Sequence, residues 1–430
     1  MFIVYAKAVT AFLLSAVLLV AWFKRPVLES FLAKKKVPWL LIFWVLLRLV
    51  PFVVIYVFFD FSPQSDVANY YYPIGISAKL REIPYRDVLN PYSPFYGFWM
   101  EIPLLFWDNT RSLVLFLTLI ELVAVWLTYR TYEGVMPRAE RLFRVLFYLL
   151  LPVPFVMSIL SGQEDVALWI FALLAIVALQ RDGNAYLCGL LLALGILSTK
   201  AVFILIILPF FLLTRRLIPL MAGLATLGIP VLIFLYIKTG SLFIEQPLEE
   251  GKYLKAPNWA SLLHPFTSGF INAELSVWNY AGLVICLLVG VQVLRLRGNH
   301  DYRTYFPLFY IATFSLMTVV QKNAVANYTY LFMLPLVFQM VDFRNRTSVV
   351  FLLVFNIAAA VHPSLWWRIG QPYYQTVSEI FSKPVYILEY SIELFIVGYL
   401  LYLVVKAQKQ LKLAPQLAPI PPLKPEPTRM

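Results

Sequence analysis

Long apolar blocks recur along the whole chain of 430 residues and are separated by short polar connections. Hydrophobic residues make up 61% of the sequence and charged residues only 13%. An apolar stretch of about 20 residues is what a membrane-spanning helix requires. A helix also satisfies its own backbone hydrogen bonds within lipid. The sequence therefore predicts an all-α integral membrane protein, built as a polytopic helix bundle.

The lengths and breaks of these blocks predict about thirteen spans. They are placed at residues 2–23, 37–59, 112–129, 145–160, 166–180, 185–199, 201–214, 217–238, 277–294, 304–320, 328–341, 347–361 and 386–405. We interpret residues 1–36 as an additional transmembrane helix with a basic cytoplasmic loop, 37–405 as the main transmembrane domain, and 406–430 as a disordered proline-rich cytoplasmic tail. Most of the nearby positive charge follows the first apolar block, so it is read as a span and not as a cleaved signal peptide.

The distribution of basic residues predicts the orientation. The connections expected on one side hold about twice as many Lys and Arg residues as those on the other side, and cytoplasmic loops carry this excess. The amino terminus is therefore expected outside and the carboxyl tail inside. The net charge of +12 follows from the same pattern, and no basic stretch with interleaved aromatics indicates a nucleic-acid partner.

The longest polar interruption near the start of the chain, residues 60–101, is rich in aromatic side chains. Tyr and Trp present flat apolar faces with a polar group, which suits a sugar ring and also a membrane surface. Apolar side chains at helical spacing predict a short amphipathic segment on the outer face: Val67, Tyr70, Tyr71, Ile74 and Ala78. Residues 94–107 are apolar but too short to span, so they are expected to lie in the outer interface or to dip into the outer half of the bilayer. We interpret this loop as a substrate-binding lip.

The predicted spans between residues 145 and 238 are short and are broken by polar segments. Two breaks, SGQED at 161–165 and STK at 198–200, are expected on the same outer side as the first loop. The cytoplasmic connections are far shorter than a domain of about 100 residues. No glycine-rich nucleotide-binding motif is present. An enzyme acting on the outer face would therefore need an energy-rich substrate that is already outside, and a lipid-linked substrate meets this need.

Several motifs follow one another between residues 37 and 345. They are an early acid followed by tyrosines (Asp66, 70–72), Pro84-Tyr85-Arg86-Asp87, Pro-Tyr-Ser-Pro at 91–94, Gly162-Gln163-Glu164-Asp165, Lys200, and Asn327-Tyr328 before an apolar run that ends at Pro335. This order resembles that of the polyprenyl-phosphate-sugar-dependent glycosyltransferases of superfamily C. Within that group the chain is similar to the mannosyltransferases that act on phosphatidylinositol and glycolipid anchors.

The resemblance implies a glycosyltransferase-C-type fold over residues 37–405 and an inverting hexosyltransferase, with mannose as the expected sugar. The donor would be a polyprenyl-phosphate-linked sugar and the acceptor a lipid or glycan in the membrane. The site would face the extracytoplasmic side of the plasma membrane in a bacterium, or of the endoplasmic reticulum in a eukaryote.

Such a transfer needs a carboxylate that accepts the proton of the attacking hydroxyl and cations that stabilise the departing phosphate. Asp66 is the candidate catalytic base. The candidate phosphate ligands are Lys200, Lys322, Arg86 and Arg368. The other candidate substrate-binding residues are Tyr71, Tyr85, Asp87, Gln163, Asp165 and Tyr328.

The first loop departs from the family in one respect that concerns metals. Several relatives carry two acids separated by one residue, whereas Ser65-Asp66-Val67-Ala68 supplies one. No cofactor is therefore assigned, and a divalent metal has little support from this loop. We interpret His264 and His362 as hydrogen-bonding residues of loops, because no second His or acid lies at ligand spacing.

Structural alternatives remain open for these residues. Ser65 or Asp66 would cap the amphipathic segment, and Glu164-Asp165 would cap the next helix. Arg86-Asp87 would be a local ion pair. Lys200 would extend its ammonium group from a helix end, and the tyrosines would form an interfacial belt. The alternative functions are a transporter or flippase of lipid-linked sugars, a polysaccharide polymerase, and a structural membrane protein. Polar residues are expected to gather on the outer side, which favours an outward-facing active site.

Overall fold

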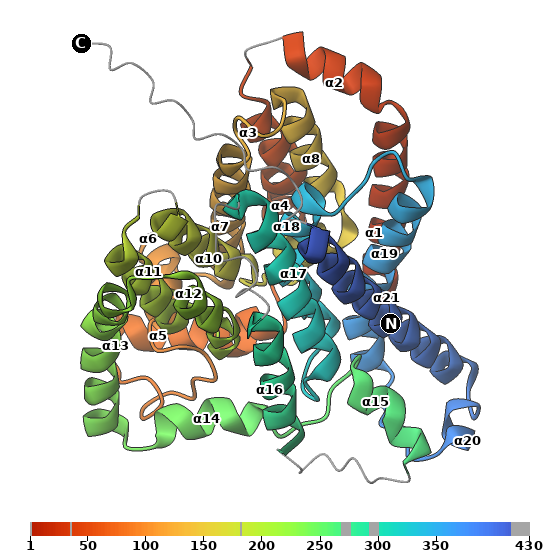
Figure 1. Ribbon diagram of the computed structural model, residues 1–430. Helices are drawn as coiled ribbons and strands as arrows, with labels where there is room; N and C mark the ends of the chain where they lie inside the picture. Colours follow the sequence, from red (N-terminus) through yellow and green to blue (C-terminus); the bar gives the residue numbers. More distant parts are fainter. Residues whose placement is uncertain (1, 35–36, 181–182, 268–276, 292–300, 414–430) are drawn as a thin grey trace, which may run out of the picture.

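The computed structural model describes residues 2–34, 37–180, 183–267, 277–291 and 301–413. Within these ranges the chain is helical and contains no β-strand, only one isolated bridge between Pro84 and Val88. The predicted all-α class is confirmed for this part of the chain. Figure 1 shows the helices as a bundle with α2 at the top and α14, α15 and α20 at the bottom.

The first half of the chain alternates α-helices with short π-helical segments. Its elements are α1 (Phe2–Phe23), α2 (Arg25–Lys34), α3 (Trp39–Trp44), η1 (Val45–Leu49), α4 (Val50–Phe52), η2 (Val53–Phe58), η3 (Val67–Tyr71), α5 (Tyr72–Lys79), α6 (Tyr96–Phe106), α7 (Thr110–Thr131), α8 (Arg138–Leu150), α9 (Pro152–Phe155), η4 (Val156–Leu160) and α10 (Val166–Gln180). The segments η1 to η4 are π-helices. This helix type, with hydrogen bonds between residues five apart, is rare and often occurs at functional sites.

The second half begins with two helices that pack against each other, α11 and α13. Its elements are α11 (Ala185–Ser198), η5 (Ala201–Ile206), α12 (Ile207–Leu213), α13 (Leu217–Thr239), α14 (Leu242–Glu250), α15 (Trp259–Leu263), η6 (His264–Phe266), α16 (Val277–Val291), α17 (Tyr302–Val320), η8 (Ala326–Thr329), α18 (Tyr330–Gln339), α19 (Arg346–Arg368), α20 (Val377–Ile380) and α21 (Pro384–Leu413). Helix α17 lies inside the bundle, where it packs against α16, α18 and α21.

Six helices of the described chain are long and apolar enough to cross a membrane. They are Phe2–Phe23, Trp39–Phe58, Thr110–Thr131, Leu217–Thr239, Arg346–Arg368 and Pro384–Leu413. The pair Arg138–Leu150 and Pro152–Leu160, bent by 62°, would make a seventh. The chain is thus a multi-pass membrane protein in outline. Several other predicted spans coincide with apolar helices that are too short to cross alone, so the number thirteen stays a prediction.

The structure corrects three details of the sequence interpretation. The basic segment after α1 is largely a helix, α2, and not a loop. The predicted tail begins later, because α21 continues to Leu413; residues 414–430 lie outside the described chain. The predicted connection 239–276 contains α14 and α15, and its residues 268–276 are likewise outside the described chain.

Charged side chains are also found in the middle of the bundle and are not confined to one side. Arg48 and Glu121 lie midway along two candidate spans and are fully buried. Their Nε–Oε2 and Nη2–Oε1 distances are 2.6 and 2.9 Å, which makes a two-pronged ion pair. Arg48 also donates to the carbonyl of Leu149 at 2.8 Å, and Ser158 donates to Glu121 at 2.8 Å. This pair therefore joins four elements of the bundle: η1, α7, α8 and η4.

Several of the connections predicted to be cytoplasmic lie near α2 (Figure 1): residues 37–38, the start of α8 and residues 340–345. Backbone carbonyls there accept hydrogen bonds from side chains of other segments: Trp22 to Phe343 at 2.9 Å, Arg138 to Val37 at 3.0 Å, Arg144 to Val341 at 3.4 Å and Lys406 to Met340 at 3.2 Å. The guanidinium group of Arg25 lies over the ring of Phe343, 5.0 Å from its centroid. Basic side chains thus link the segments that the sequence places on the inner side.

A separate apolar cluster underlies the first loop. It includes Val67, Tyr71 and Ile74 and is formed by side chains of α4, η2, η3, α5, α6, α7, α9 and η4. The buried positions Val67, Tyr71, Ile74 and Ala78 confirm the predicted amphipathic segment. Glycine allows α5 and α6 to approach closely, because a Cβ on Gly75 would lie 2.7 Å from a methyl group of Leu104. The cluster fixes η3, and therefore the residue before it, Asp66.

Candidate functional site

Two polar segments meet above this apolar cluster. Asp66 is the residue directly before η3. Its Oδ2 accepts a hydrogen bond of 3.0 Å from Nε2 of Gln163, 97 positions later. The other oxygen, Oδ1, accepts a longer hydrogen bond of 3.4 Å from the hydroxyl of Ser65. Asp66 makes no capping hydrogen bond to η3, so the capping interpretation is wrong for this residue. The carboxylate is half-buried and keeps one oxygen largely free.

The two acids after Gln163 bind a lysine from a third segment. Nζ of Lys200 lies 2.6 Å from Oδ1 of Asp165 and 2.9 Å from Oε1 of Glu164. Both acids are buried, and the Lys200 side chain is 14% exposed. The ammonium group also lies 5.3 Å from the centroid of the Tyr328 ring. The predicted residues Asp66, Gln163, Asp165, Lys200 and Tyr328 thus come together from segments that are far apart in the sequence.

The turn that carries Gln163, Glu164 and Asp165 depends on the glycine before it. Gly162 has φ of +57°, a conformation that residues with a Cβ rarely adopt. A Cβ there would also lie 2.6 Å from a methyl group of Val67. The π-helix η4 leads into this turn, and the π-helix η3 lies on the other side of the contact. Only glycine lets the two segments approach closely enough for Gln163 to reach Asp66.

Tyrosine rings from the first loop form one wall of the site. Tyr92 and Tyr96 stack with centroids 4.5 Å apart, and Tyr71 meets their edges at 5.4 and 5.2 Å. The hydroxyl of Tyr71 donates a hydrogen bond to Oε2 of Glu164. The wall is therefore tied directly to the acidic turn. Interlocked edge-to-face and stacked rings of this kind form a rigid apolar surface with polar groups at its margin.

The electrostatics of the site follow from burial and from these pairings. Burial raises the pKa of Asp165 to about 6, with Lys200 acting in the opposite direction and Glu164 in the same direction. For Lys200, burial disfavours the charged form, but Asp165 and Glu164 outweigh it and raise the pKa of the ammonium group. Burial and the Glu164 carboxylate raise the pKa of the Tyr71 hydroxyl. Lys200 is therefore charged at neutral pH, and Tyr71 is a hydrogen-bond donor.

Four of the predicted residues lie at the margin of this arrangement or outside it. Tyr85 donates to the carbonyl of Tyr92 at 2.6 Å and so supports the tyrosine wall from behind. Arg86 and Asp87 form an exposed ion pair of 2.8 Å, which confirms the local interpretation of this pair. Arg368 is exposed at the end of α19. Among the described residues, no contact links these three charged groups to Asp66.

Lys322 is buried next to residues 255–258, outside the group around Asp66. Its backbone carbonyl accepts hydrogen bonds from the Lys255 amide at 2.9 Å and from Nδ2 of Asn258 at 2.9 Å. The segment is nevertheless close to the site, because the charges of both Lys200 and Lys255 act on Tyr328. The predicted convergence of Lys200 and Lys322 on one phosphate stays a prediction.

Sequence reasoning missed two contributors to the site. Lys7 of α1 is buried and donates a hydrogen bond of 3.1 Å to the hydroxyl of Ser161. Gln246 of α14 accepts from the amide of Asn90 at 2.9 Å and donates to the carbonyl of Tyr85 at 2.7 Å, which holds the first loop. A lone lysine in the first apolar block was the available signal for Lys7, since a charge inside a span is costly.

The site could bind an uncharged polar ring beside a partly free carboxylate. Asp66 can accept a proton, the tyrosines offer a stacking surface, and Gln163 fixes the carboxylate. The three acids would suit a cation in principle. However, the ammonium group of Lys200 already lies between Glu164 and Asp165. The site therefore does not fit a metal ion at that position, and we derive no step through one.

No family model matches the chain, and a search of curated proteins finds no significant match. A functional assignment must therefore come from the geometry of the site and from the motifs that form it.

Proposed function

We propose that the protein is a membrane glycosyltransferase that transfers a hexose, with mannose as the expected sugar, from a polyprenyl-phosphate carrier to a lipid or glycan acceptor. The observation that carries this proposal is the meeting of Asp66 with Gln163, Asp165, Lys200 and Tyr328 beside a tyrosine wall. These residues belong to the motifs on which the resemblance to superfamily C rests. Their order in the sequence alone gave no reason for them to be in contact.

Asp66 acts as the base in this proposal. The acceptor hydroxyl attacks the anomeric carbon while its proton passes to the carboxylate oxygen that Gln163 leaves free. The bond between the anomeric carbon and the phosphate oxygen breaks at the same time, and the polyprenyl phosphate leaves with the electron pair. Attack from the face opposite the phosphate inverts the configuration. A phosphate is a stable leaving group and needs no general acid.

Lys200 has a more constrained role than the sequence suggested. Two carboxylates already neutralise its charge, so a donor phosphate would compete with them. Its first role in this proposal is to hold Glu164 and Asp165, and through Glu164 also Tyr71, in place.

The proposed side of the membrane follows from the charges. The end of the bundle that carries α2 is rich in basic side chains and is assigned to the cytoplasm. The site then faces the extracytoplasmic side, which is the outer face of the plasma membrane in a bacterium and the lumen of the endoplasmic reticulum in a eukaryote. In this arrangement about thirteen segments of the chain enter the membrane, and the shorter ones pass only part of the way.

A transporter of lipid-linked saccharides is the second candidate. The buried pair of Arg48 and Glu121, midway along two candidate spans, favours it. Intramembrane ion pairs are common in transport pathways.

Purified protein in liposomes, given a panel of radiolabelled polyprenyl-phosphate hexoses and membrane-lipid acceptors, tests the proposal. We expect a new glycosidic bond of inverted configuration with one donor. Asp66→Asn should lower the rate on the order of 10² to 10⁴-fold, as loss of a general base does. The control is Asp60→Asn in the same loop, whose side chain is 82% exposed and whose loss should leave the rate unchanged.

An Asp66→Asn variant that transfers sugar as fast as the wild type would reject Asp66 as the base. Movement of the labelled lipid across the liposome membrane, with no glycosidic product for any donor, would reject the enzyme and support the transporter.

A further inference from the structure

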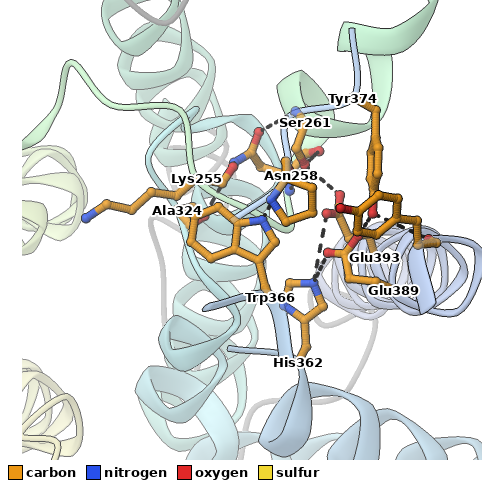
Figure 2. Close-up of polar contacts among 11 residues, drawn as sticks. Lys255, Asn258, Ser261, Ala324, His362, Trp366, Tyr374, Glu389 and Glu393 are labelled. Atoms are coloured by element: carbon orange, nitrogen blue, oxygen red, sulfur yellow. Dashed lines mark hydrogen bonds and ion pairs between the residues drawn. The ribbon is translucent and has the colours of Figure 1, made fainter. Parts of the chain in front are cut away.

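A second buried polar cluster lies between α19, α21 and the segment around α15. His362 comes from α19, and Glu389 and Glu393 come from successive turns of α21. Nε2 of His362 is 3.0 Å from Oε1 of Glu389 and 3.9 Å from Oε1 of Glu393. All three side chains are buried, with at most 1% exposed. Figure 2 shows the imidazole ring directed at both carboxylates.

The structure corrects the interpretation of His362 as a loop residue without an acid at ligand spacing. His362 lies within a helix, and its two acids come from another helix 27 and 31 positions later. The two acids are four positions apart on α21, so they share one face of that helix. Spacing within a single element could not show this group.

The distances fit a metal ion. Two ligand atoms that are each about 2.1 Å from one ion are about 3.0 to 4.2 Å apart, depending on the angle between them. The two distances from the imidazole nitrogen fall within this range. One nitrogen and two carboxylate oxygens, all within 4.8 Å of one another, therefore need only small side-chain rotations to bind the same ion.

Charge and hydrogen bonding point the same way. Two buried carboxylates face one imidazole, and buried carboxylates are costly unless a cation or protons neutralise them. Nδ1 of His362 is buried and has no hydrogen-bond partner among the described residues. Without an ion, Nε2 carries the ring proton and donates it to Oε1 of Glu389. When an ion binds, Nδ1 can take up this proton, and Nε2 then offers its lone pair to the ion.

Hydroxyl groups orient both carboxylates from outside. Tyr374 donates to Oε2 of Glu389 at 2.7 Å, and Ser261 donates to Oε2 of Glu393 at 2.8 Å. Each acid is thus held by its second oxygen while its first oxygen faces His362. Hydrogen bonds of this kind, from residues around a site to its ligands, are typical of protein metal centres.

We propose that His362, Glu389 and Glu393 bind a divalent transition-metal ion. The ligand set selects its class, because imidazole with carboxylates suits Zn²⁺ or Mn²⁺, whereas Mg²⁺ and Ca²⁺ prefer oxygen ligands alone. This inference does not depend on the proposed glycosyl transfer.

The position of the cluster gives the ion a structural role. Ser261 also binds Asn258, whose Nδ2 donates to the carbonyls of Lys322 and Ala324 at 2.9 and 3.3 Å. Figure 2 shows this group above the two glutamates, with the Lys255 side chain directed away from the cluster. The ion would therefore fix the 255–261 segment to α21, next to the segment that leads to Tyr328.

Metal analysis of the purified full-length protein tests the site. We expect about one Zn²⁺ or Mn²⁺ per chain, removal by a chelator, and restoration by Co²⁺ with the visible absorption of a protein-bound ion. Glu393→Gln keeps the shape and the contact with Ser261 but removes a ligand charge, so it should abolish the Co²⁺ spectrum. Tyr374→Phe removes only an outer hydrogen bond and should weaken binding roughly 10 to 100-fold.

Controls separate a ligand from a merely structural residue. His264→Gln, at a histidine that contacts the Tyr374 carbonyl and not the carboxylates, should leave the Co²⁺ spectrum intact. Added metal should raise the thermal unfolding temperature of the wild type but not that of Glu393→Gln. A wild-type protein without bound metal, without a Co²⁺ spectrum and without a thermal shift would overturn the proposal. The cluster would then be one that shares protons between its carboxylates.

Discussion

Asp165 is the residue whose ionisation should be visible in the stability of the protein. Burial raises its pKa from 3.8 to about 6. Below pH 3.8 the carboxyl group is protonated in both the folded and the unfolded chain. As the pH rises to about 6, the unfolded chain loses this proton first, so the group increasingly disfavours folding. Above that pH both states are ionised and the effect is constant.

The unfolding temperature of the wild type should therefore fall, relative to that of Asp165→Asn, as the pH rises from 3.8 to about 6. Thermal unfolding in detergent at a series of pH values measures this difference. Lys200→Met should move the end of the transition to higher pH, because Lys200 lowers the pKa of Asp165. Parallel curves for the wild type and Asp165→Asn would show that the carboxyl group is not perturbed.

At the residue scale, the sequence predicted those parts of the site that belong to polar breaks between apolar blocks. Asp66, Gln163 and Lys200 interrupt such blocks and could be recognised for that reason. Lys7 and His362 could not be assigned, because their partners come from distant segments. Which face of a helix meets which neighbour depends on tertiary packing, and no local pattern in this sequence encodes it.

At the scale of the element, the turn before Gln163 gives a sharp test. Gly162→Ala places a Cβ in a left-handed conformation and 2.6 Å from Val67. Gly183→Ala is the matched control, because Gly183 has a similar φ of +62° but no atom within 4 Å of the added Cβ. Both variants should lose roughly 1 to 2 kcal/mol from the backbone conformation. Only Gly162→Ala should also displace η3, and with it Asp66.

Thermal unfolding and sugar transfer, measured on both variants, separate the two effects. The expected result is similar backbone strain but a loss of transfer specific to Gly162→Ala. Equal stability and equal activity in the two variants would mean that the contact with Val67 does not position the site.

Helix lengths explain why the positions of helices were easier to predict than which helices cross the whole membrane. The pattern of Val67, Tyr71 and Ile74 gave the helix of the first loop correctly, since one face is buried. Hydropathy alone could not distinguish a complete span from α12, with 7 residues, or α18, with 10. Helices inside a bundle are apolar because neighbouring helices surround them, and this resembles the signal that lipid produces.

At the scale of the whole molecule, the orientation can be tested with single cysteines. Both native cysteines are buried, so the background labelling should be low. Gln64 and Lys409 are exposed at positions expected on opposite sides. Cysteines at these positions should react with an impermeant reagent from opposite faces of sealed vesicles. Labelling of both from the same face would reject the proposed topology.

The lengths of α10 and α11 have a consequence for how a substrate arrives. These helices contain 15 and 14 residues; α10 begins directly after Asp165, and α11 ends two residues before Lys200. They are about 22 and 21 Å long, whereas the hydrocarbon core of a bilayer is about 30 Å thick. In the proposed orientation the far ends of these helices lie at the cytoplasmic surface, which would place Asp165 and Lys200 several ångströms below the outer headgroups. A substrate that diffuses in two dimensions within the leaflet would reach this depth sideways, while a sugar dissolved in water would first have to shed its hydration shell.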